Sequence, residues 1–279
     1  MITSFLSLFS PYATNVTANQ ISIPLLAYSH IVPIVVAIAF GLFLFLKTKK
    51  LSAFYLFLLC VVFSIFAFFD VTAWLPNSYL IMFSWSILDV FSTGCFVLSY
   101  WFLYSFIKER DLSLLQKALT ASALIPSFII IWINLNISSF YVPTGIALDN
   151  AAVNNYDSIL WFSLLLLIII FIIVEYRKAV DVVSKNKIAL AGIGVVAFLF
   201  IFFFSYVIIN FIVSVNLWGL ASNAYVYNLS IYSILGMPIL LALLGYLIAK
   251  YQAFDMKLIK SIVYMVVLMA LLFAGLFLV

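Results

Sequence analysis

The chain has 279 residues, of which 68% are hydrophobic and 8% charged, and its mean hydropathy is +1.31. Soluble domains average about 45–50% apolar and about 25% charged residues, so a soluble fold of this size would expose too much apolar surface to water. The composition therefore excludes a soluble enzyme, a nucleic-acid-binding domain and a disulfide scaffold. It predicts a polytopic protein whose main partner is the lipid bilayer.

Long apolar runs predict an all-α fold, a polytopic bundle of membrane-spanning helices. A bilayer core of about 30 Å needs about 20 apolar residues in helical conformation. Strands are disfavoured, because barrel spans would be about 10 residues long with alternating polar positions. We expect seven core spans and an eighth C-terminal one, at 24–46, 52–75, 80–107, 116–137, 159–175, 188–214, 227–249 and 261–279.

The basic residues predict the orientation of these spans. Counting Lys117, the second residue of the fourth run, with the connection before it, all 13 Lys and Arg residues fall in alternate connections, those after the first, third, fifth and seventh runs. The opposite connections, 76–79, 138–158 and 215–226, contain none, and neither does the N-terminal tail. Basic residues beside spans are retained in the cytoplasm during insertion. We therefore expect a multi-pass protein of the plasma (inner) membrane, with its N-terminus outside and its basic loops in the cytoplasm.

This topology divides the chain into consecutive parts. We expect an external tail, a seven-helix membrane domain, a cytoplasmic link and an eighth span, at 1–23, 24–249, 250–260 and 261–279. The external connection 138–158 is too short for a domain but long enough to cover a cavity. The last apolar run stops at Val279 without flanking polar residues. We therefore expect it to be truncated, with another span and cytoplasmic domains beyond it.

The residue types present exclude several cofactors. All lysines lie in predicted cytoplasmic connections, so a retinal Schiff base inside the bundle is excluded. The single histidine, His30, cannot by itself make a histidine metal site or a haem ligand pair. Walker-type glycine loops and Gly-x-Ser-x-Gly elbows do not occur in the sequence. We expect no cofactor, no metal and no catalytic residue, so the chain as given is not an enzyme.

Asp89 is the main candidate for a functional residue. It lies about nine residues into the third run, about 14 Å deep at about 1.5 Å per residue. An ionised carboxylate there costs at least about 2.5 kcal/mol, and such groups are usually functional or internally paired. Ser86 and Thr93 lie at helical spacing around it and can hydrogen-bond the carboxyl group. Asp89 is either a ligand contact or proton-sensing acid, or a structural post that holds helices together.

Other polar residues lie toward the predicted outer side. Asp70 is about five residues from the outer end of the second run, and His30 is at the outer end of the first. Asn210 lies in the sixth run between Tyr206 and Ser214, at helical spacing. With Asp89, these residues predict an outer-leaflet polar cavity for an unknown small ligand or membrane stimulus. The alternative for each is an ordinary interfacial position or an interhelical hydrogen bond.

The exit of the seventh run carries a family resemblance. The stretch Leu244–Met256, LGYLIAKYQAFDM, resembles the exit of the N-terminal seven-helix region found on many bacterial sensor histidine kinases. Ala253 stands where leucine is more usual in that family. A looser match covers the aromatic-rich segment 74–106, and the similarity extends over about 24–256. The matching exit residues are Tyr246, Lys250, Tyr251, Phe254 and Asp255.

The resemblance implies a sensory membrane module that works as a homodimer. In such a module a stimulus outside or within the bilayer shifts a two-state helix packing, and the change passes to a cytoplasmic transmitter. The link 250–260, with Lys250, Tyr251, Phe254 and Asp255, would carry the output. The chain departs from the family because it holds no transmitter: it lacks ATP-binding glycines, and its one histidine is predicted to be external.

Other classes stay open. A small-solute transporter or channel predicts helices broken by Gly or Pro near the membrane centre, in paired positions. Pro126 and the Gly236-Met-Pro238 triplet fit this pattern, but no internal repeat relates them. An accessory integral membrane protein is the remaining alternative. A lipid-modifying enzyme would need clustered acidic or histidine residues at an interface, whereas the cytoplasmic acidic residues are scattered among basic ones.

Overall fold

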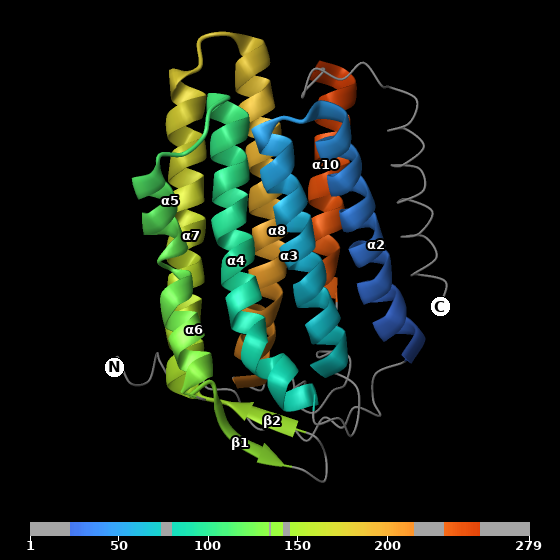
Figure 1. Cartoon of the computed structure of the whole chain (residues 1–279), viewed down its shortest axis with the longest axis vertical. Coiled ribbons are helices and arrows are strands. Elements are labelled where there is room, and N and C mark those ends of the chain that lie inside the picture. Colours follow the sequence, from blue (N-terminus) through green and yellow to red (C-terminus); the bar gives the residue numbers. More distant parts are fainter. Residues whose placement is uncertain (1–22, 74–79, 134, 142–145, 215–231, 252–279) are drawn as a thin grey trace.

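The computed structural model shows one bundle of long helices that run along the longest dimension of the molecule (Figure 1). It describes residues 23–73, 80–133, 135–141, 146–214 and 232–251. The long helices are α2 (Ile23–Thr48), α3 (Leu51–Ala73), α4 (Leu80–Lys108), α7 (Ala151–Lys178), α8 (Val182–Ser214) and α10 (Gly236–Tyr251).

Six helical stretches among the described residues are long and apolar enough to cross a membrane: one each in α2, α3, α4, α7 and α8, and the stretch Leu114–Trp132. The apolar part of α10, Gly236–Leu247, is shorter. This confirms the predicted multi-pass helical bundle. The predicted seventh span is described from residue 232 onward, as a 3-10 turn, Tyr232–Leu235, followed by α10. The predicted eighth span, 261–279, and all but the last residue of the 1–23 tail lie outside the described residues. The count of seven spans plus an eighth therefore stays a prediction.

The predicted fourth span, 116–137, is not one continuous helix. It divides into α5 (Leu114–Ala121) and α6 (Leu124–Trp132), with the interruption at Ser122 and Ala123. Pro126 accounts for the break, because a proline has no N–H to donate and its ring clashes with the carbonyl four residues earlier, here that of Ser122. α5 begins at a capping box, in which Ser113 and Gln116 each bond the other's backbone N–H.

The predicted external connection 138–158 is largely ordered into regular structure. An antiparallel hairpin forms from β1 (Ile137–Tyr141) and β2 (Ile146–Asp149), with Tyr141 opposite Ile146. α7 then begins at Ala151 rather than near residue 159, because the Asn150 side chain accepts a hydrogen bond from the Ala152 N–H at 3.0 Å and caps the helix. The predicted all-α fold class is confirmed for the described residues, to which this small hairpin is a local addition.

The packing order of the helices is set by aromatic and small side chains. α3 lies between α2 and α4, and α8 packs on both α7 and α10. Trp161 of α7, Phe96 of α4 and Phe203 of α8 contact one another in the core. At Gly236 a Cβ atom would lie 2.9 Å from the Phe198 carbonyl oxygen. Glycine therefore lets the start of α10 approach the backbone of α8 directly.

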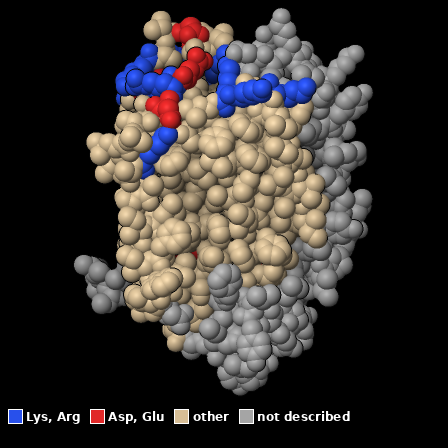
Figure 2. Space-filling model, viewed as in Figure 1, with Lys and Arg blue, Asp and Glu red and all other residues tan. Residues whose placement is uncertain are grey.

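Lys and Arg side chains gather at one end of the bundle, which we call the basic end (Figure 2). There α2, α4 and α7 finish, and α3 and α8 begin (Figure 1). The hairpin lies at the opposite end (Figure 1). The described basic residues are Lys47, Lys49, Lys50, Lys108, Arg110, Lys117, Arg177, Lys178, Lys185 and Lys187. This distribution agrees with the alternation of basic connections along the sequence.

Candidate functional site

The two residues that the sequence placed near the outer ends of the first and second spans form a pair. His30 Nε2 of α2 lies 2.9 Å from Asp70 Oδ2 of α3. The His30 side chain is fully buried, whereas the Asp70 side chain is 22% exposed. Ser29 Oγ lies 2.9 Å from His30 Nδ1, so both ring nitrogens have polar partners. The pair joins α2 to α3 near the end opposite the basic end.

The local sequence of α2 and α3 brings this pair together. The two helices are connected by a tight turn in which Lys49 adopts a left-handed φ of 51° and donates to the Phe45 carbonyl at 2.9 Å. They therefore run antiparallel, and residues far from the turn on each helix meet. Pro33 lies inside α2 and cannot donate to the Ser29 carbonyl. The hydrogen-bond ladder of α2 is consequently interrupted beside His30.

Burial makes the His30–Asp70 contact energetically important. A buried polar group that loses its partner costs about 1–3 kcal/mol, and a broken buried ion pair costs about 3–5 kcal/mol. A ligand or side chain that competes for the Asp70 carboxylate therefore weakens the contact between α2 and α3.

A second polar contact lies close to the pair. Thr72 Oγ1 of α3 and Ser84 Oγ of α4 are 2.6 Å apart, and Thr72 also donates to the Phe69 carbonyl at 2.8 Å. Ser84 is buried. Together with the pair, this contact ties α2, α3 and α4 at one end. Sequence analysis did not select Ser29 or Ser84, because serines are common in these runs and carry no specific signal.

Thr93 makes a buried contact between α4 and α7. Trp161 Nε1 of α7 donates to Thr93 Oγ1 of α4 at 2.9 Å, and both residues are buried. The Phe96 ring stacks on the Trp161 ring with centroids 6.2 Å apart. Asp89 and Ser86 lie on the same helix, are half-buried and have interaction partners. Asp89 therefore lies at a half-buried position of α4, and its predicted role stays a prediction.

Other predicted residues lie at or beyond the edge of the described part of the chain. Asn210 belongs to α8 by its backbone, but its side chain is outside the described residues. Lys250 and Tyr251 form the end of α10, and their side chains are likewise outside the described residues. Phe254 and Asp255 of the predicted link are not among the described residues at all. The predicted roles of these four positions therefore stay predictions.

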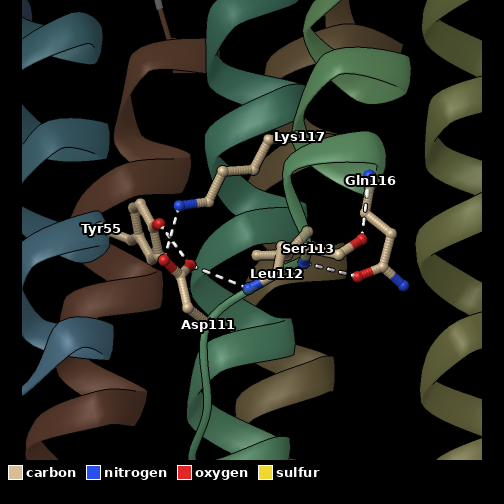
Figure 3. A network of polar contacts seen from close by, with 6 residues as sticks. All are labelled: Tyr55, Asp111, Leu112, Ser113, Gln116 and Lys117. Carbon is tan, nitrogen blue, oxygen red and sulfur yellow. Dashed lines mark hydrogen bonds and ion pairs between the residues drawn. The ribbon is translucent and has the colours of Figure 1, made fainter.

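A polar network at the basic end joins α3 to the α4–α5 connection (Figure 3). Asp111 accepts hydrogen bonds from Tyr55 Oη at 2.7 Å, from Lys117 Nζ at 2.6 Å and from the Leu112 N–H at 2.8 Å. Lys117 Nζ also lies 5.6 Å from the centroid of the Tyr55 ring. Burial acts to raise the pKa of the Asp111 carboxyl, but the bonds from Lys117 and Tyr55 outweigh it and hold that pKa below its ordinary value.

A second ion pair at the basic end joins α4 to α7. Lys108 Nζ lies 2.5 Å from Glu175 Oε2, and Lys178 Nζ lies 3.3 Å from Glu175 Oε1. Glu175 is buried although it lies near the end of α7. Sequence analysis treated Lys108, Asp111, Lys117 and Glu175 only as charges of the cytoplasmic connections. The sequence feature that could have predicted this contact is the presence of a glutamate in an otherwise apolar run.

No protein-family model matches this chain, and no curated protein matches it. The likeness to the sensor regions of bacterial histidine kinases therefore depends on the stretch Leu244–Met256, which begins within α10, and on the looser match over 74–106.

Proposed function

We propose that the chain is the sensory input module of a signal-transduction protein of the two-component histidine kinase type. In this proposal the module lies in the plasma (inner) membrane with its basic end in the cytoplasm, and it works as a homodimer. A stimulus from outside or within the bilayer changes the helix packing, and the link 250–260 passes the change to a cytoplasmic transmitter. The His30–Asp70 pair is the observation that carries the proposal.

The pair has the properties that a sensory switch requires. It joins two helices through a contact that a ligand competing for Asp70 would weaken, and Asp70 is partly exposed. A difference of a few kcal/mol is enough to shift a two-state equilibrium between helix packings. Pro33 supplies a weakened point in α2 beside the pair. Making or breaking the pair is therefore expected to change how the outer part of α2 lies on α3.

The helix contacts offer a route from the pair to the output. α2 packs on α3 and also on α10, which ends at Tyr251 where the proposed link begins. α3 carries Asp70 near one end and Tyr55 near the other, about 22 Å apart along a helix at about 1.5 Å per residue. Tyr55 contacts Asp111 at the basic end. A shift of α2 or α3 thus reaches the segments that face the cytoplasm in this proposal.

A fusion experiment tests the sensory function. The chain through Met256 is joined to the transmitter of a well-behaved histidine kinase, and autophosphorylation is measured in nanodiscs for the unchanged chain and for D70N. We expect a several-fold change in basal output for D70N at equal expression. The matched control is S163A, because Ser163 is exposed and its hydroxyl donates to the carbonyl of Ile159 on its own helix. Equal output for D70N and S163A would contradict the proposal.

A second candidate, a small-solute transporter or channel, is favoured by the helix interruptions. The described chain breaks one span at Ser122 and Ala123, and a 3-10 turn precedes α10 at Gly236. Broken helices of this kind line substrate sites in many transporters. This function predicts solute flux across proteoliposomes containing the chain alone, together with a fusion whose kinase output does not respond to D70N.

A further inference from the structure

α4 and α7 run side by side in a constant register. Trp161 donates to Thr93 at a sequence separation of 68, and Lys108 pairs with Glu175 at a separation of 67. The two contacts lie about four turns apart on each helix, at 3.6 residues per turn. Because the offset between the helices hardly changes over this length, the helices are parallel and their facing residues can be assigned beyond the two contacts.

The same offset places Asp89 and Asp157 at one level. Asp89 lies four residues before Thr93, and Asp157 lies four residues before Trp161, so their separation is again that of the Trp161–Thr93 contact. Residues at i and i+4 lie on the same face of a helix. The face of α4 that meets α7 therefore includes Asp89, and the face of α7 that meets α4 includes Asp157.

Burial agrees with this assignment. Asp157 is 2% exposed, whereas Ile159 and Phe162 on the same part of α7 are 63% and 55% exposed. Asp157 thus lies on the inward side of a helix whose opposite side faces lipid. Asp89 is half-buried on α4, and both aspartates have interaction partners.

We propose that Asp89 and Asp157 form a carboxyl pair that holds one proton between α4 and α7. Two carboxylates at close range in a poorly solvated site cannot both be ionised, so one proton stays with the pair. The protonated carboxyl then donates a charge-assisted hydrogen bond to the ionised one, which is about twice as strong as a neutral bond. The proton belongs to the pair rather than to either residue.

The other titratable groups around this pair do not change the proposal that Asp89 and Asp157 share one proton. α3 contributes Asp70, which is held by His30, and α6 contains no titratable residue. Tyr156 neighbours Asp157 on α7 itself. α8 and β2 carry Tyr206 and Asp149, whose side chains lie outside the described residues. Among the described side chains, no Lys or Arg lies on this half of the bundle, because the described basic residues gather at the other end (Figure 2).

The carboxyl pair gives the α4–α7 contact a proton-dependent element, whether or not the chain is a sensor. At the basic end the Lys108–Glu175 pair holds the helices, and the Trp161–Thr93 bond holds them nearer the middle. Loss of the shared proton places two negative charges on facing helices and weakens the contact on the hairpin side of that bond. The expected result is separation of the first turns of α7 from α4 at high pH.

Cysteine cross-linking tests the proposed geometry. Cys60 and Cys95 are replaced by alanine, and D89C is combined with D157C in the whole chain in nanodiscs. We expect a short bifunctional thiol reagent to join the two positions, seen as a cross-linked peptide by mass spectrometry. The control is D89C with I159C, because Ile159 points to the lipid side of α7. Cross-linking of the control alone, or of neither combination, would overturn the assignment.

Infrared spectroscopy tests the shared proton. In the unchanged chain at neutral pH we expect the carbonyl-stretch band of a protonated carboxyl, and we expect the D89N/D157N double variant to lack it. Each single Asn variant should alter the band, because each removes one half of the pair. D70N should leave it in place. The proposal would be overturned if one of the two single replacements left the band unchanged. It would also be overturned if the unchanged chain and the double variant gave identical spectra.

Discussion

The imidazole of His30 lies 2.9 Å from the carboxylate of Asp70, and this contact joins two antiparallel helices at the end of the bundle away from the basic residues. The histidine is fully buried, whereas the aspartate is partly exposed. In the proposed sensory function, a stimulus would act on Asp70 from the solvent or headgroup side, and His30 would pass the change to the interior of α2.

Replacing Asp70 by alanine leaves the buried imidazole of His30 without this carboxylate. We predict a loss of about 1–3 kcal/mol, the cost of an unsatisfied buried polar group. The measurement is the midpoint of unfolding in a mild detergent, with S163A as the exposed control. D70N should lose less, since an amide oxygen can still accept a hydrogen bond from the ring. An unchanged midpoint for D70A would show that the contact contributes nothing to stability.

Thr93 and Trp161 form a second buried hydrogen bond that a double-mutant cycle can measure. T93V leaves the Trp161 N–H without its acceptor, so we predict a loss of about 1–3 kcal/mol. In the W161F background no N–H remains, so T93V should cost clearly less there than in the unchanged chain. If T93V changed the free energy of unfolding equally in both backgrounds, the hydrogen bond would contribute nothing to stability.

Gly236 allows α10 to begin directly against α8. A Cβ atom there would lie 2.9 Å from the Phe198 carbonyl oxygen, which is backbone and cannot move aside cheaply. We predict that G236A destabilises the bundle by about 1–3 kcal/mol, as overpacking does. At Gly194 the nearest atom is the end of the flexible Leu240 side chain at 3.2 Å, so G194A is the matched control. A larger unfolding shift for G194A than for G236A would contradict this explanation.

The Asp111 network predicts a pH effect at the basic end. The bonds from Lys117 and Tyr55 lower the pKa of the Asp111 carboxyl in the folded chain despite the opposing effect of burial. The network is therefore fully stabilising above the ordinary aspartate pKa of about 3.9. This contribution is lost as the pH falls through the lowered, folded-state value. Unfolding midpoints measured from neutral to acidic pH should fall less steeply for D111N than for the unchanged chain. Parallel curves for the two proteins would contradict the assignment.

The sequence predicted the main features of the bundle, because span length and basic residues depend on the bilayer rather than on tertiary detail. It predicted the apolar helices and the gathering of the basic connections on one side of the bundle. It did not predict that the fourth span divides at Ser122 and Ala123. Pro126 was noted, but the run is apolar on both sides of the division. It also did not predict the hairpin, since one short hairpin in a membrane protein has little signal above the surrounding loop residues.

The candidate site was predicted in its residues but not in its contacts. His30 and Asp70 were both selected, yet nothing in a separation of 40 residues shows that they meet. Their meeting follows from the antiparallel packing of α2 and α3. Asp157 was missed as a membrane residue because the polar start of α7, AAVNNYDS, resembles a loop in composition. The Asn150 cap extends the helix through this segment and places Asp157 at a buried position.

The most direct test of the proposed sensory function is a double-mutant cycle on His30 and Asp70 in the kinase fusion. Output is measured for the unchanged chain, H30Q, D70N and the double variant at equal expression. We predict that each single replacement changes basal output several-fold. We also predict that the fold-change in output of the double variant differs strongly from the product of the two single fold-changes. A coupling of about 1.4 kcal/mol corresponds to a tenfold departure. Output equal to that of the unchanged chain in all three variants would contradict the proposed role of this pair.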